Sequence, residues 1–513
     1  MAKSWVNSAE RIGVDLHLEP AGSGGRRAAL IAALREAVRS GRLAPGTRLP
    51  PYRSLAADLG VARNTVADAY AELVAEGWLS ARQGSGTRVA ERAEPLRPLR
   101  GLRPAERGSE NVPPRARESS APPRARGSMA LPRPHGPRHD LRQGTPDASA
   151  FPRAAWLASY RRALQQAPSE VFGPGDPAGR AELREALTEY LARARGVRTE
   201  PGRIVVCSGF AHGLRLLFEG HGRELGGPLA MEAYGLPFHR ELLAAAGVRT
   251  VPLPLDEQGA RVDRLARERA VLLTPAHQFP TGGPLHAERR AAVVDWARAR
   301  GGVVLEDDYD GEFRYDRRPV GAVQGLDPER VILLGSVSKS LSPAVRLGWM
   351  VLPERYVGAV LAAKGEREAW ASVLDQLSLA DFIGSGSYDR HVRRMRQRYR
   401  SRRDRLVAAL ATHAPHIEVA GVAAGLHAVL RLPPGTERSA VEAAARQGVA
   451  LDGLAGFRHP DTDMAATDGL VVGYATPSEH VYGAALEALC AVLPPGADCR
   501  VLPADDPPGT APG

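Results

Sequence analysis

The spacing of apolar residues predicts three helices followed by a hairpin within the first ninety positions. The stretch RAALIAALREAVRSGRLAPG is amphipathic at the helical period and ends in the breakers Gly41 and Pro45-Gly46. PYRSLAADLG predicts a short second helix, with Leu55 and Leu59 four positions apart on one face. A third helix is predicted in RNTVADAYAELVAEGWLS, and the glycine-containing ARQGSGTRVA that follows predicts a hairpin.

A second pattern begins near Leu141, where short apolar runs alternate with amphipathic stretches. Such alternation predicts a mainly parallel sheet wrapped by helices. After about Ala380, a long arginine-rich helix and further alternating runs predict a smaller α+β domain. The predicted strands are 203–207, 229–232, 250–252, 270–274, 303–305 and 331–334, and the predicted helices are 180–194, 209 onward, 237–246 and 287–299.

Residues 91–140 separate these two parts and contain ten prolines and eleven arginines, but no lysine and few large apolar side chains. Such a segment buries too little apolar surface to fold, so it predicts a flexible linker. Its arginines either contact DNA phosphates without sequence preference or only keep the tether soluble. We therefore expect an N-terminal domain over 1–90, then the linker, a C-terminal unit over 141–500 and a disordered tail over 501–513. Within the C-terminal unit, we expect a large part over about 186–375 and a small part formed by 141–185 and 380–500.

The net charge of +10 is unevenly distributed along the chain. The first 140 residues carry 23 Lys and Arg against 14 Asp and Glu, whereas the remainder is almost neutral. A basic end on a neutral body indicates a polyanionic partner, although a solvated basic tail has the same composition. The N-terminus lacks the apolar core of a signal peptide, no apolar run is long enough to span a bilayer, and the three cysteines form no metal-ligand pattern. We therefore expect a cytoplasmic protein without a membrane segment or a metal site.

Three helices and a hairpin are the components of a winged helix-turn-helix, in which the third helix enters the major groove of DNA. Its first residues here are Arg63, Asn64 and Thr65, whose side chains suit base edges and phosphates. Further candidate DNA contacts lie on the preceding helix and in the hairpin, namely Arg53, Arg82, Gly84 and Arg88. A small helical domain without a DNA function is the alternative. The residue order over 41–89 resembles the GntR family of bacterial DNA-binding domains, which implies double-stranded DNA as the partner.

Candidate chemistry centres on the stretch GSVSKSLSPAVRLG, which follows the apolar run 331–334. A buried environment favours the neutral amine of Lys339, the form that makes an imine with an aldehyde. Ser336 and Ser338 supply hydroxyl donors and Arg346 a fixed positive charge, a set suited to a phosphate. Pyridoxal 5′-phosphate carries both an aldehyde and a phosphate, and it is the cofactor that this set predicts. An ordinary strand-to-loop turn with a solvated lysine is the alternative.

Two other turns come directly after predicted strands, where open α/β sheets place their ligands. Gly209 and Phe210 open a predicted helix, so their backbone N–H groups suit a phosphate. In the acidic run EDDYD, Asp307 suits a protonated pyridine nitrogen and Tyr309 suits a ring hydroxyl. A solvated turn or a metal site is the alternative for this run, and the lack of an accompanying His or Cys cluster disfavours the metal.

The motifs VILLGSVSKSLSPAVRLGW, TPAHQFPTG, VLEDDYDGEFRYD, VVCSGFAHGL and DRHVRRMRQRY together resemble fold-type-I aminotransferases. More narrowly, with the N-terminal domain, they resemble the MocR family, in which a GntR-type winged helix is fused to an aminotransferase-like domain. The resemblance covers about residues 15–90 and 141–495. It implies an α/β fold-type-I body, an internal aldimine on Lys339 and a homodimer that binds paired DNA half-sites. It also implies a set of residues around the cofactor: Lys339, Asp307 and Tyr309 in catalytic roles, Ser336, Ser338, Arg346, Gly209 and Phe210 around the phosphate, and His277 and Gln278 near the ring.

Three departures from the aminotransferase pattern bear on function. The loop 279–282, Phe-Pro-Thr-Gly, replaces the Asn-Pro-Gly type loop of many true aminotransferases, which points toward the regulators. Leu236 occupies the position of a tyrosine that approaches the cofactor, although Tyr234 is close by. The run ATDGLVVGYATPSE contains no arginine to pair with a substrate carboxylate, so amino-acid binding is expected to be weaker or different.

The stretch DRHVRRMRQRYRSRRDR predicts a helix with arginines almost all round. One interpretation is a solvated helix with Met395 and Tyr399 facing inward. The other is a second contact with DNA phosphates, and the sequence leaves both open.

These features favour a transcription regulator that binds DNA and senses pyridoxal phosphate, or an amine that reacts with it, through Lys339. Aldimine formation would shift the conformation of the body, and the linker would pass the change to the DNA-binding domains. The alternative is an active aminotransferase with an accessory DNA-binding domain. A third hypothesis, an empty body, is disfavoured by the complete phosphate cup. Control of vitamin B6 synthesis fits the missing arginine slightly better than control of amino-acid metabolism.

Overall fold

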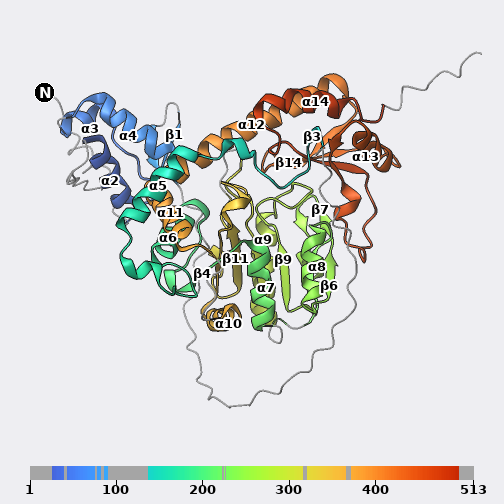
Figure 1. Cartoon of the computed structure of the whole chain (residues 1–513), viewed down its shortest axis with the longest axis horizontal. Helices are drawn as coiled ribbons and strands as arrows, with labels where there is room; N and C mark the ends of the chain where they lie inside the picture. The colour runs from blue at the N-terminus through green and yellow to red at the C-terminus, as the bar shows by residue number, and fades with distance from the viewer. Residues whose placement is uncertain are drawn as a thin grey trace, which may run out of the picture.

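The computed structural model shows a winged-helix domain beside a larger body with two sheets (Figure 1). The winged-helix domain lies at one end of the molecule, next to helix α5 (Arg153–Gln166) and the start of helix α12 (Ser387–His413). Helix α12 runs from there toward the smaller sheet (Figure 1). The structure describes residues 26–39, 43–59, 61–75, 78–82, 86–90, 137–221, 225, 227–315, 320–365 and 371–495.

The winged-helix domain contains the elements that the sequence predicts. Its helices are α2 (Arg26–Arg39), α3 (Tyr52–Asp58) and α4 (Arg63–Ala75), and strands β1 (Leu79–Arg82) and β2 (Gly86–Val89) form the antiparallel wing. Apolar positions at the helical period, among them Leu55, Val66 and Leu73, form its buried core. The tip of the wing, which includes Gly84, lies outside the described residues.

The larger sheet of the body has seven strands in the order β4-β12-β11-β10-β9-β5-β6. Strands β11, β10, β9, β5 and β6 pair in parallel, and β12 is antiparallel to both of its neighbours. This is the mainly parallel sheet that the alternating pattern predicts, with β12 as a strand that the pattern missed. The strands are β4 (Ile204–Cys207), β5 (Leu229–Glu232), β6 (Thr250–Leu253), β9 (Ala270–Leu273), β10 (Val303–Asp307), β11 (Val331–Ser336) and β12 (Gly348–Val351).

Helices cover both faces of this sheet, because alternate side chains of the strands point to opposite sides. In β4, Val205 belongs to one apolar cluster, whereas Ile204 and Val206 belong to another. On the first face, the helices are α7 (Phe210–His221), α8 (Pro237–Ala245) and α10 (Glu354–Lys364). On the second face, they are α6 (Ala181–Arg195), α9 (Ala287–Arg300) and α11 (Val373–Gly384).

Strands β10 and β11 extend further than the sequence predicts. Strand β10 includes Glu306 and Asp307, and β11 includes Gly335 and Ser336. Carboxylates rarely occur in buried strands, so the apolar pattern predicted the end of β10 at residue 305, before Glu306. The carboxylate of Glu306 is buried but accepts backbone hydrogen bonds from Val323 and Gln324, each at 2.9 Å. Because the two strands pair in parallel, their carboxyl ends place Asp307 and Ser336 at one edge of the sheet.

The smaller sheet is antiparallel throughout and has the strand order β13-β14-β17-β16. Its strands are β13 (Glu418–Ala420), β14 (His427–Arg431), β16 (Asp452–Gly453) and β17 (Gly469–Gly473), with helices α13 (Glu437–Arg446) and α14 (Tyr482–Cys490) nearby. A parallel pair of β3 (His139–Asp140) and β15 (Val449–Ala450) attaches the beginning of the body to this part. Strands β7 (Leu255–Asp256) and β8 (Gly259–Ala260) form a short antiparallel pair.

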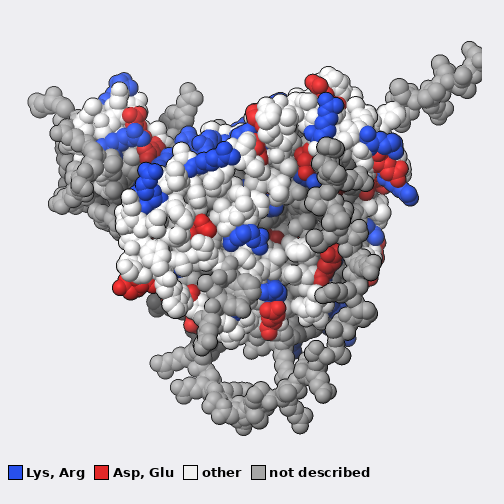
Figure 2. Space-filling view, in the orientation of Figure 1, with Lys and Arg blue, Asp and Glu red and all other residues white. Residues whose placement is uncertain are grey.

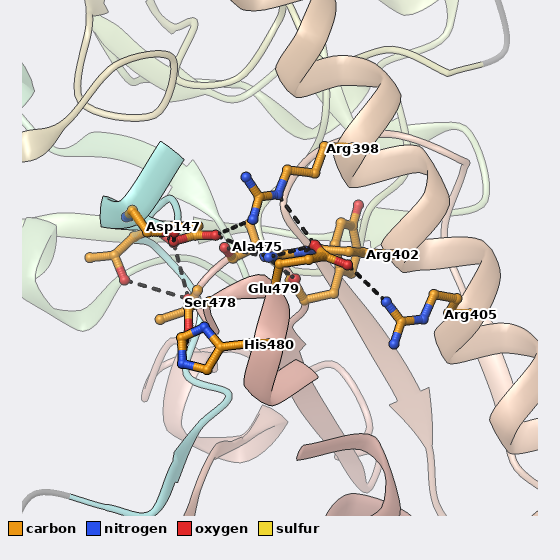
Figure 3. A network of polar contacts seen from close by, with 12 residues as sticks. Asp147, Arg398, Arg402, Arg405, Ala475, Ser478, Glu479 and His480 are labelled. Atoms are coloured by element: carbon orange, nitrogen blue, oxygen red, sulfur yellow. Dashed lines mark hydrogen bonds and ion pairs between the residues drawn. The ribbon is translucent and has the colours of Figure 1, made fainter. Parts of the chain in front are cut away.

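Helix α12 contains a buried ionic network that the sequence did not predict (Figure 3). Met395 and Tyr399 are buried, as one interpretation of this helix predicts, but Arg402 is also buried, with 1% of its surface exposed. Its guanidinium donates to Asp147 Oδ2 at 3.0 Å and to Glu479 Oε2 at 3.1 Å, whereas its Nη1 donates to a backbone carbonyl at 3.0 Å. The network therefore anchors the chain around Asp147 to α12.

Two predicted segments cannot be compared with the structure. The predicted linker, apart from residues 137–140, and the predicted C-terminal tail lie outside the described residues. Within the described part of the chain, no helix combines the length and the apolar character needed to cross a membrane.

Candidate functional site

A cavity of about 210 Å³ lies where strands β10 and β11 end and helix α7 begins. Its wall brings together most of the residues that the sequence singled out for a cofactor, although they come from distant segments of the chain. The members of that set in the wall are Gly209, Phe210, Asp307, Tyr309, Ser336, Ser338, Lys339 and Arg346. The fold thus assembles the predicted set, while the role of each residue stays a prediction.

The amine of Lys339 is held in a protein-enclosed position. Burial lowers its pKa below the ordinary lysine value, and the negative charges of Asp307 and Asp310 oppose this effect. The Nζ donates a hydrogen bond to the backbone carbonyl of Gly144, in the segment that Asp147 anchors. A lowered pKa increases the fraction of neutral amine, which is the nucleophilic form.

The carboxyl group of Asp307 sits among other charges at the end of β10. Burial raises its pKa well above the ordinary value, the negative charge of Asp308 adds to the rise, and Lys339 opposes it. Asp308 itself is paired with Arg195, which donates to both carboxylate oxygens at 2.7 Å. The bidentate pair orients the backbone next to Asp307, and a cation in the cavity would stabilise the ionised form of Asp307.

One end of the cavity collects groups that suit a phosphate. The N-terminus of α7 begins at Phe210, and Gly209 has φ of 118°, with open space where a Cβ would stand. Arg346 follows a short 3-10 turn with φ of 54°, a left-handed conformation that costs about 1–3 kcal/mol for a non-glycine residue. Ser336 and Ser338 line the same wall. Backbone amides, hydroxyls and a guanidinium are the groups that bind phosphates in proteins.

Two predicted cofactor residues lie behind the wall instead of in it. His277 Nδ1 is 2.8 Å from Asp310 Oδ2 and 3.0 Å from the Tyr309 hydroxyl. Gln278 donates to the backbone carbonyls of Tyr234, at 2.9 Å, and Phe279, at 2.6 Å. His277 and Gln278 therefore act on the cavity through Tyr309 and through the backbone of the surrounding loops.

The wall also contains residues to which the sequence analysis gave no role. Glu232 is buried, which raises its pKa to about 7, and it accepts a hydrogen bond from the Thr274 hydroxyl at 2.6 Å. Burial lowers the pKa of both His239 and His427 to about 3, so both rings are neutral near pH 7. Neither histidine lies in a turn directly after a predicted strand, so the residue order did not indicate them. Glu232 and Tyr234 do lie at the end of a predicted strand, at 229–232, and their position was a usable signal.

From the region of the smaller sheet, the described lining of the cavity includes Leu426 and His427. Strand β17 lies outside this lining: all five of its residues are buried, and Val471 packs in one cluster with Tyr234 and Phe279. Among the described residues that line the cavity, the only arginine is Arg346, at the phosphate-binding end. In the described lining, no arginine therefore lies outside the phosphate-binding end, as the run ATDGLVVGYATPSE indicates.

These residues fit pyridoxal phosphate. The α7 N-terminus with Ser336, Ser338 and Arg346 would hold the phosphate, and Asp307 would face the pyridine nitrogen. The buried hydroxyl of Tyr234 lines the same cavity and has no hydrogen-bond partner among the described residues, so a polar group in the cavity would satisfy it.

Several of the predicted DNA contacts are exposed on the described part of the winged-helix domain. Arg63 and Asn64 are exposed at the start of α4, and Thr65 is half-buried. The Arg63 guanidinium stands 5.1 Å from the centre of the Tyr52 ring. Among the other candidates, Arg53 is exposed on α3, Arg82 ends β1, and Arg88 is exposed on β2, while Gly84 lies outside the described residues.

Further basic side chains lie next to this domain. Figure 2 shows Lys and Arg side chains gathered over the region of α5 and the first half of α12. The exposed arginines in that half of the helix are Arg390, Arg393, Arg394, Arg396 and Arg400.

Comparisons with known proteins agree with both parts of the fold. Residues 26–89 match the model of the bacterial regulatory proteins of the gntR family, and residues 140–464 match that of aminotransferase class I and II. The chain belongs to the MocR-type family of transcriptional regulators. In this family, a GntR-type DNA-binding domain is joined to an aminotransferase-like domain that binds pyridoxal phosphate, so the predicted fold, cofactor and regulator class are confirmed.

The relatives of this MocR-type chain include named regulators. It is 32% identical to the HTH-type pyridoxine biosynthesis transcriptional regulator PdxR of Corynebacterium glutamicum, over 87% of this chain and 91% of the relative. It is 33% identical to the probable rhizopine catabolism regulatory protein MocR of Rhizobium meliloti, over 86% of this chain and 88% of the relative. A third relative, at 34% identity, is the HTH-type transcriptional regulator TauR of Rhodobacter capsulatus, over 79% of this chain and 83% of the relative.

Solved structures share the fold of the body. An archaeal alanine:glyoxylate aminotransferase superimposes with a TM-score of 0.62 at 23% identity, over 69% of this chain and 90% of that chain. The kynurenine aminotransferase of Pyrococcus horikoshii gives the same TM-score and coverage at 24% identity. At these identities the likeness establishes the fold alone.

Proposed function

We propose that this MocR-type regulator binds operator DNA through residues 26–89 and senses pyridoxal phosphate through Lys339. The observation that carries the proposal is the cavity in which Lys339, Asp307 and a complete phosphate-binding end face one space, on a chain that also bears an exposed recognition helix. The alternative of an active aminotransferase lacks support from the named relatives, which are regulators.

Each residue of the cavity has a separate task in this proposal. When bound, pyridoxal phosphate supplies an aldehyde that reacts with a neutral amine. Lys339 supplies that amine, because burial keeps a larger share of it unprotonated. The negative charge of Asp307 would keep the ring nitrogen protonated. Tyr309 lines the same cavity, and its hydroxyl lies 3.0 Å from His277 Nδ1. Arg346 and the serines orient the phosphate.

The cofactor itself is the effector that the cavity favours. An amino-acid effector carries a carboxylate, and the described lining of the cavity offers no arginine outside the phosphate-binding end to pair with it. One relative is named for pyridoxine biosynthesis, which agrees with control of vitamin B6 synthesis by this chain. An amine without a carboxylate is the second class of effector that the wall admits.

We further propose a homodimer that places two winged helices on paired half-sites in the cytoplasm. Recognition helices act in pairs because each reads only a short half-site. The exposed arginines at the start of α12 lie next to the winged helix and would contact phosphates beside each half-site.

A gel-shift titration on the DNA upstream of the protein's own gene tests the proposal. DNA affinity should change on addition of pyridoxal phosphate, by about fivefold or more if the coupling is typical of allosteric proteins. Arg63→Ala should weaken binding to the same DNA by about 1–3 kcal/mol, the range for a specific base contact. Arg438→Ala is the matched control, because Arg438 is 92% exposed on α13 in the smaller domain.

Three results would count against the proposal. Unchanged DNA affinity of Arg63→Ala at physiological salt would remove the recognition helix. Identical DNA affinity with and without the cofactor would remove the sensing role. Sustained amino-group transfer to a 2-oxo acid over many cycles would favour the aminotransferase alternative.

A further inference from the structure

The first turn of helix α12 contacts the segment that carries the reactive lysine. The hydroxyl of Tyr388 donates to Ser340 Oγ at 2.7 Å, and His391 Nε2 lies 2.8 Å from the backbone carbonyl oxygen of the same serine. Burial lowers the pKa of His391 to about 4, so its ring is neutral and its Nε2–H is the donor to that carbonyl. All three residues are buried. Ser340 directly follows Lys339, so a shift of the lysine backbone reaches α12 through two buried hydrogen bonds.

The opposite side of the same turn contacts the winged-helix domain. Asp389 accepts from Arg193 Nη2 at 2.7 Å, and each of these two side chains is only 12% exposed. The guanidinium of Arg193 lies 4.9 Å from the centre of the Trp78 ring, at the base of the wing. Arg390 stands 3.7 Å from Glu72 on the recognition helix α4. The recognition helix therefore contacts this turn through Arg390, and the base of the wing contacts its partner Arg193.

Helix α6 provides a second connection from Arg193 to the cofactor cavity. The Arg193 guanidinium lies 5.6 Å from the centre of the Tyr190 ring, and that ring packs edge-on against Tyr388 at 5.1 Å. Two residues after Arg193, the buried Arg195 binds Asp308, the neighbour of Asp307. Arg193 is thus connected to both sides of the cofactor cavity, through α12 to Lys339 and through α6 to Asp307.

The contact between the winged helix and the body is loosely packed. A space of about 550 Å³ lies between Trp78 and Arg35 on one side and helices α5, α6, α11 and α12 on the other. This space is open to solvent, so it is a cleft at the contact and not an internal void. Acidic side chains line the space, among them Glu182, Glu185 and Glu189. A few polar contacts around a wide space favour an interface that can open and close.

We propose that residues 387–391, together with Arg193, form a docking surface for the winged helix. The strength of this contact depends on whether Lys339 has bound the cofactor. The inference rests on the proposed function, because it requires that the cofactor changes DNA binding. Docking leaves Arg63 and Asn64 exposed, so the docked domain can still read DNA. The surface therefore sets the orientation of the recognition helix instead of covering it, and the cofactor selects between a held and a released orientation.

The test compares DNA affinity with and without pyridoxal phosphate in full-length variants. Asp389→Asn keeps the size of the side chain but weakens its hold on Arg193. This variant should keep the visible absorption band of the bound cofactor and its DNA affinity without cofactor. The ratio of the two DNA affinities, about fivefold or more in the wild type, should fall toward one. Asp404→Asn is the matched control, because Asp404 lies on the same helix, is 64% exposed and pairs only loosely with Arg400 at 3.9 Å.

Tyr388→Phe tests the other side of the turn by removing one buried hydroxyl. It should also retain the absorption band and lose the cofactor response, and the double variant should lose no more than either single variant, since both act on one connection. Thermal unfolding shows whether each variant is folded. If Asp389→Asn does not fold, the cofactor response of Tyr388→Phe is the test of the docking surface.

The results separate this inference from the proposed function. A wild-type ratio of one means that the cofactor does not act on DNA binding, so the proposed function fails and the inference with it. A wild-type response that persists unchanged in Asp389→Asn leaves the proposed function intact and overturns the docking surface. Loss of the absorption band in Asp389→Asn also overturns it, because the turn would then serve the cavity and not the coupling.

Discussion

Two buried charged clusters of the body differ in how completely their charges are paired. In the Arg402 network, Arg402 and Arg398 face Asp147 and Glu479 directly, so each buried charge has a partner (Figure 3). In the cofactor cavity, Lys339 and Asp307 face open space and carry shifted pKa values. Complete pairing fits a structural role, whereas groups held away from their ordinary ionisation are typical of sites that await a ligand.

The largest expected effect separates the cavity from the network. Lys339→Ala removes the amine, so the protein should lose the visible band that appears when pyridoxal phosphate bonds to the wild type. Its thermal stability should fall by only about 1 kcal/mol, because the amine loses a hydrogen bond to the Gly144 carbonyl but no longer has to be buried. Absorption spectra before and after borohydride treatment measure the result. Borohydride reduces an imine, so it should abolish the wild-type band. An unchanged band in Lys339→Ala that borohydride also abolishes would show that another amine forms the imine.

Arg402→Met tests the opposite property of the network. Removing one partner of this buried ion pair leaves Asp147 with Arg398, which is 26% exposed, as its remaining cation, and should cost up to about 3–5 kcal/mol of unfolding free energy. Denaturant titration measures the loss. Arg400→Met is the control, because Arg400 is 54% exposed and its pair with Asp404 should contribute only about 0–1 kcal/mol. Equal losses of unfolding free energy in Arg402→Met and Arg400→Met would show that the buried pair contributes no more to stability than the exposed one.

The pH dependence of stability sharpens the comparison at Glu232. Burial raises its pKa from 4.5 to about 7, so the folded protein holds one more proton than the unfolded chain between these values. Stability from this group is complete below about pH 4.5 and is lost as the pH rises through about 7, by about 3 kcal/mol at most. Glu232→Gln should remove that part of the decline, whereas the exposed Glu241→Gln should leave it unchanged. Identical pH profiles for wild type and Glu232→Gln would contradict the shift.

The smallest expected effect concerns the unsatisfied hydroxyl in the cavity. Tyr234→Phe removes a buried hydroxyl that has no hydrogen-bond partner among the described residues, so stability without ligand should rise by about 1 kcal/mol. Tyr474→Phe is the control, because its hydroxyl donates to Ala424 O at 2.8 Å and its loss should lower stability by about 1 kcal/mol. A lower stability of Tyr234→Phe would show that its hydroxyl is already satisfied.

Much of the fold was predictable because its strands have a local signature. Strands β4, β5 and β9 are buried on both faces and read as short apolar runs. The same criterion ended β10 before Glu306, whose carboxylate is tolerated only because Val323 and Gln324 donate to it. It also missed β12, which follows the lysine loop without a turn signal of its own. The local apolar pattern fails to predict the end of a strand where backbone groups from a distant segment satisfy a buried polar side chain.

The part of the candidate site that lies close together in the sequence was also predictable. The chemistry of Lys339, Ser336, Ser338 and Arg346 was visible in the residue order, because the four lie within eleven consecutive residues. His277 had the right neighbours in the sequence but lies behind Tyr309, because its ring is held by Asp310. Neither His239 nor His427 was predicted, since their approach to the cavity depends on helix and strand packing.

The sequence by itself determined the two-part composition of this chain, and it indicated the candidate DNA contacts at the start of α4 and the candidate cofactor turn around Lys339. These features depend on residues close together in the chain, where period and spacing act directly. Only the tertiary structure decided which arginines are buried: Arg402 and Arg390 stand on one helix, yet one is enclosed and the other exposed. The difference comes from Asp147, 255 positions before Arg402, whose carboxylate offsets the cost of burying a charge. Such pairing over long sequence distances is also what joins the winged helix to the turn beside Lys339.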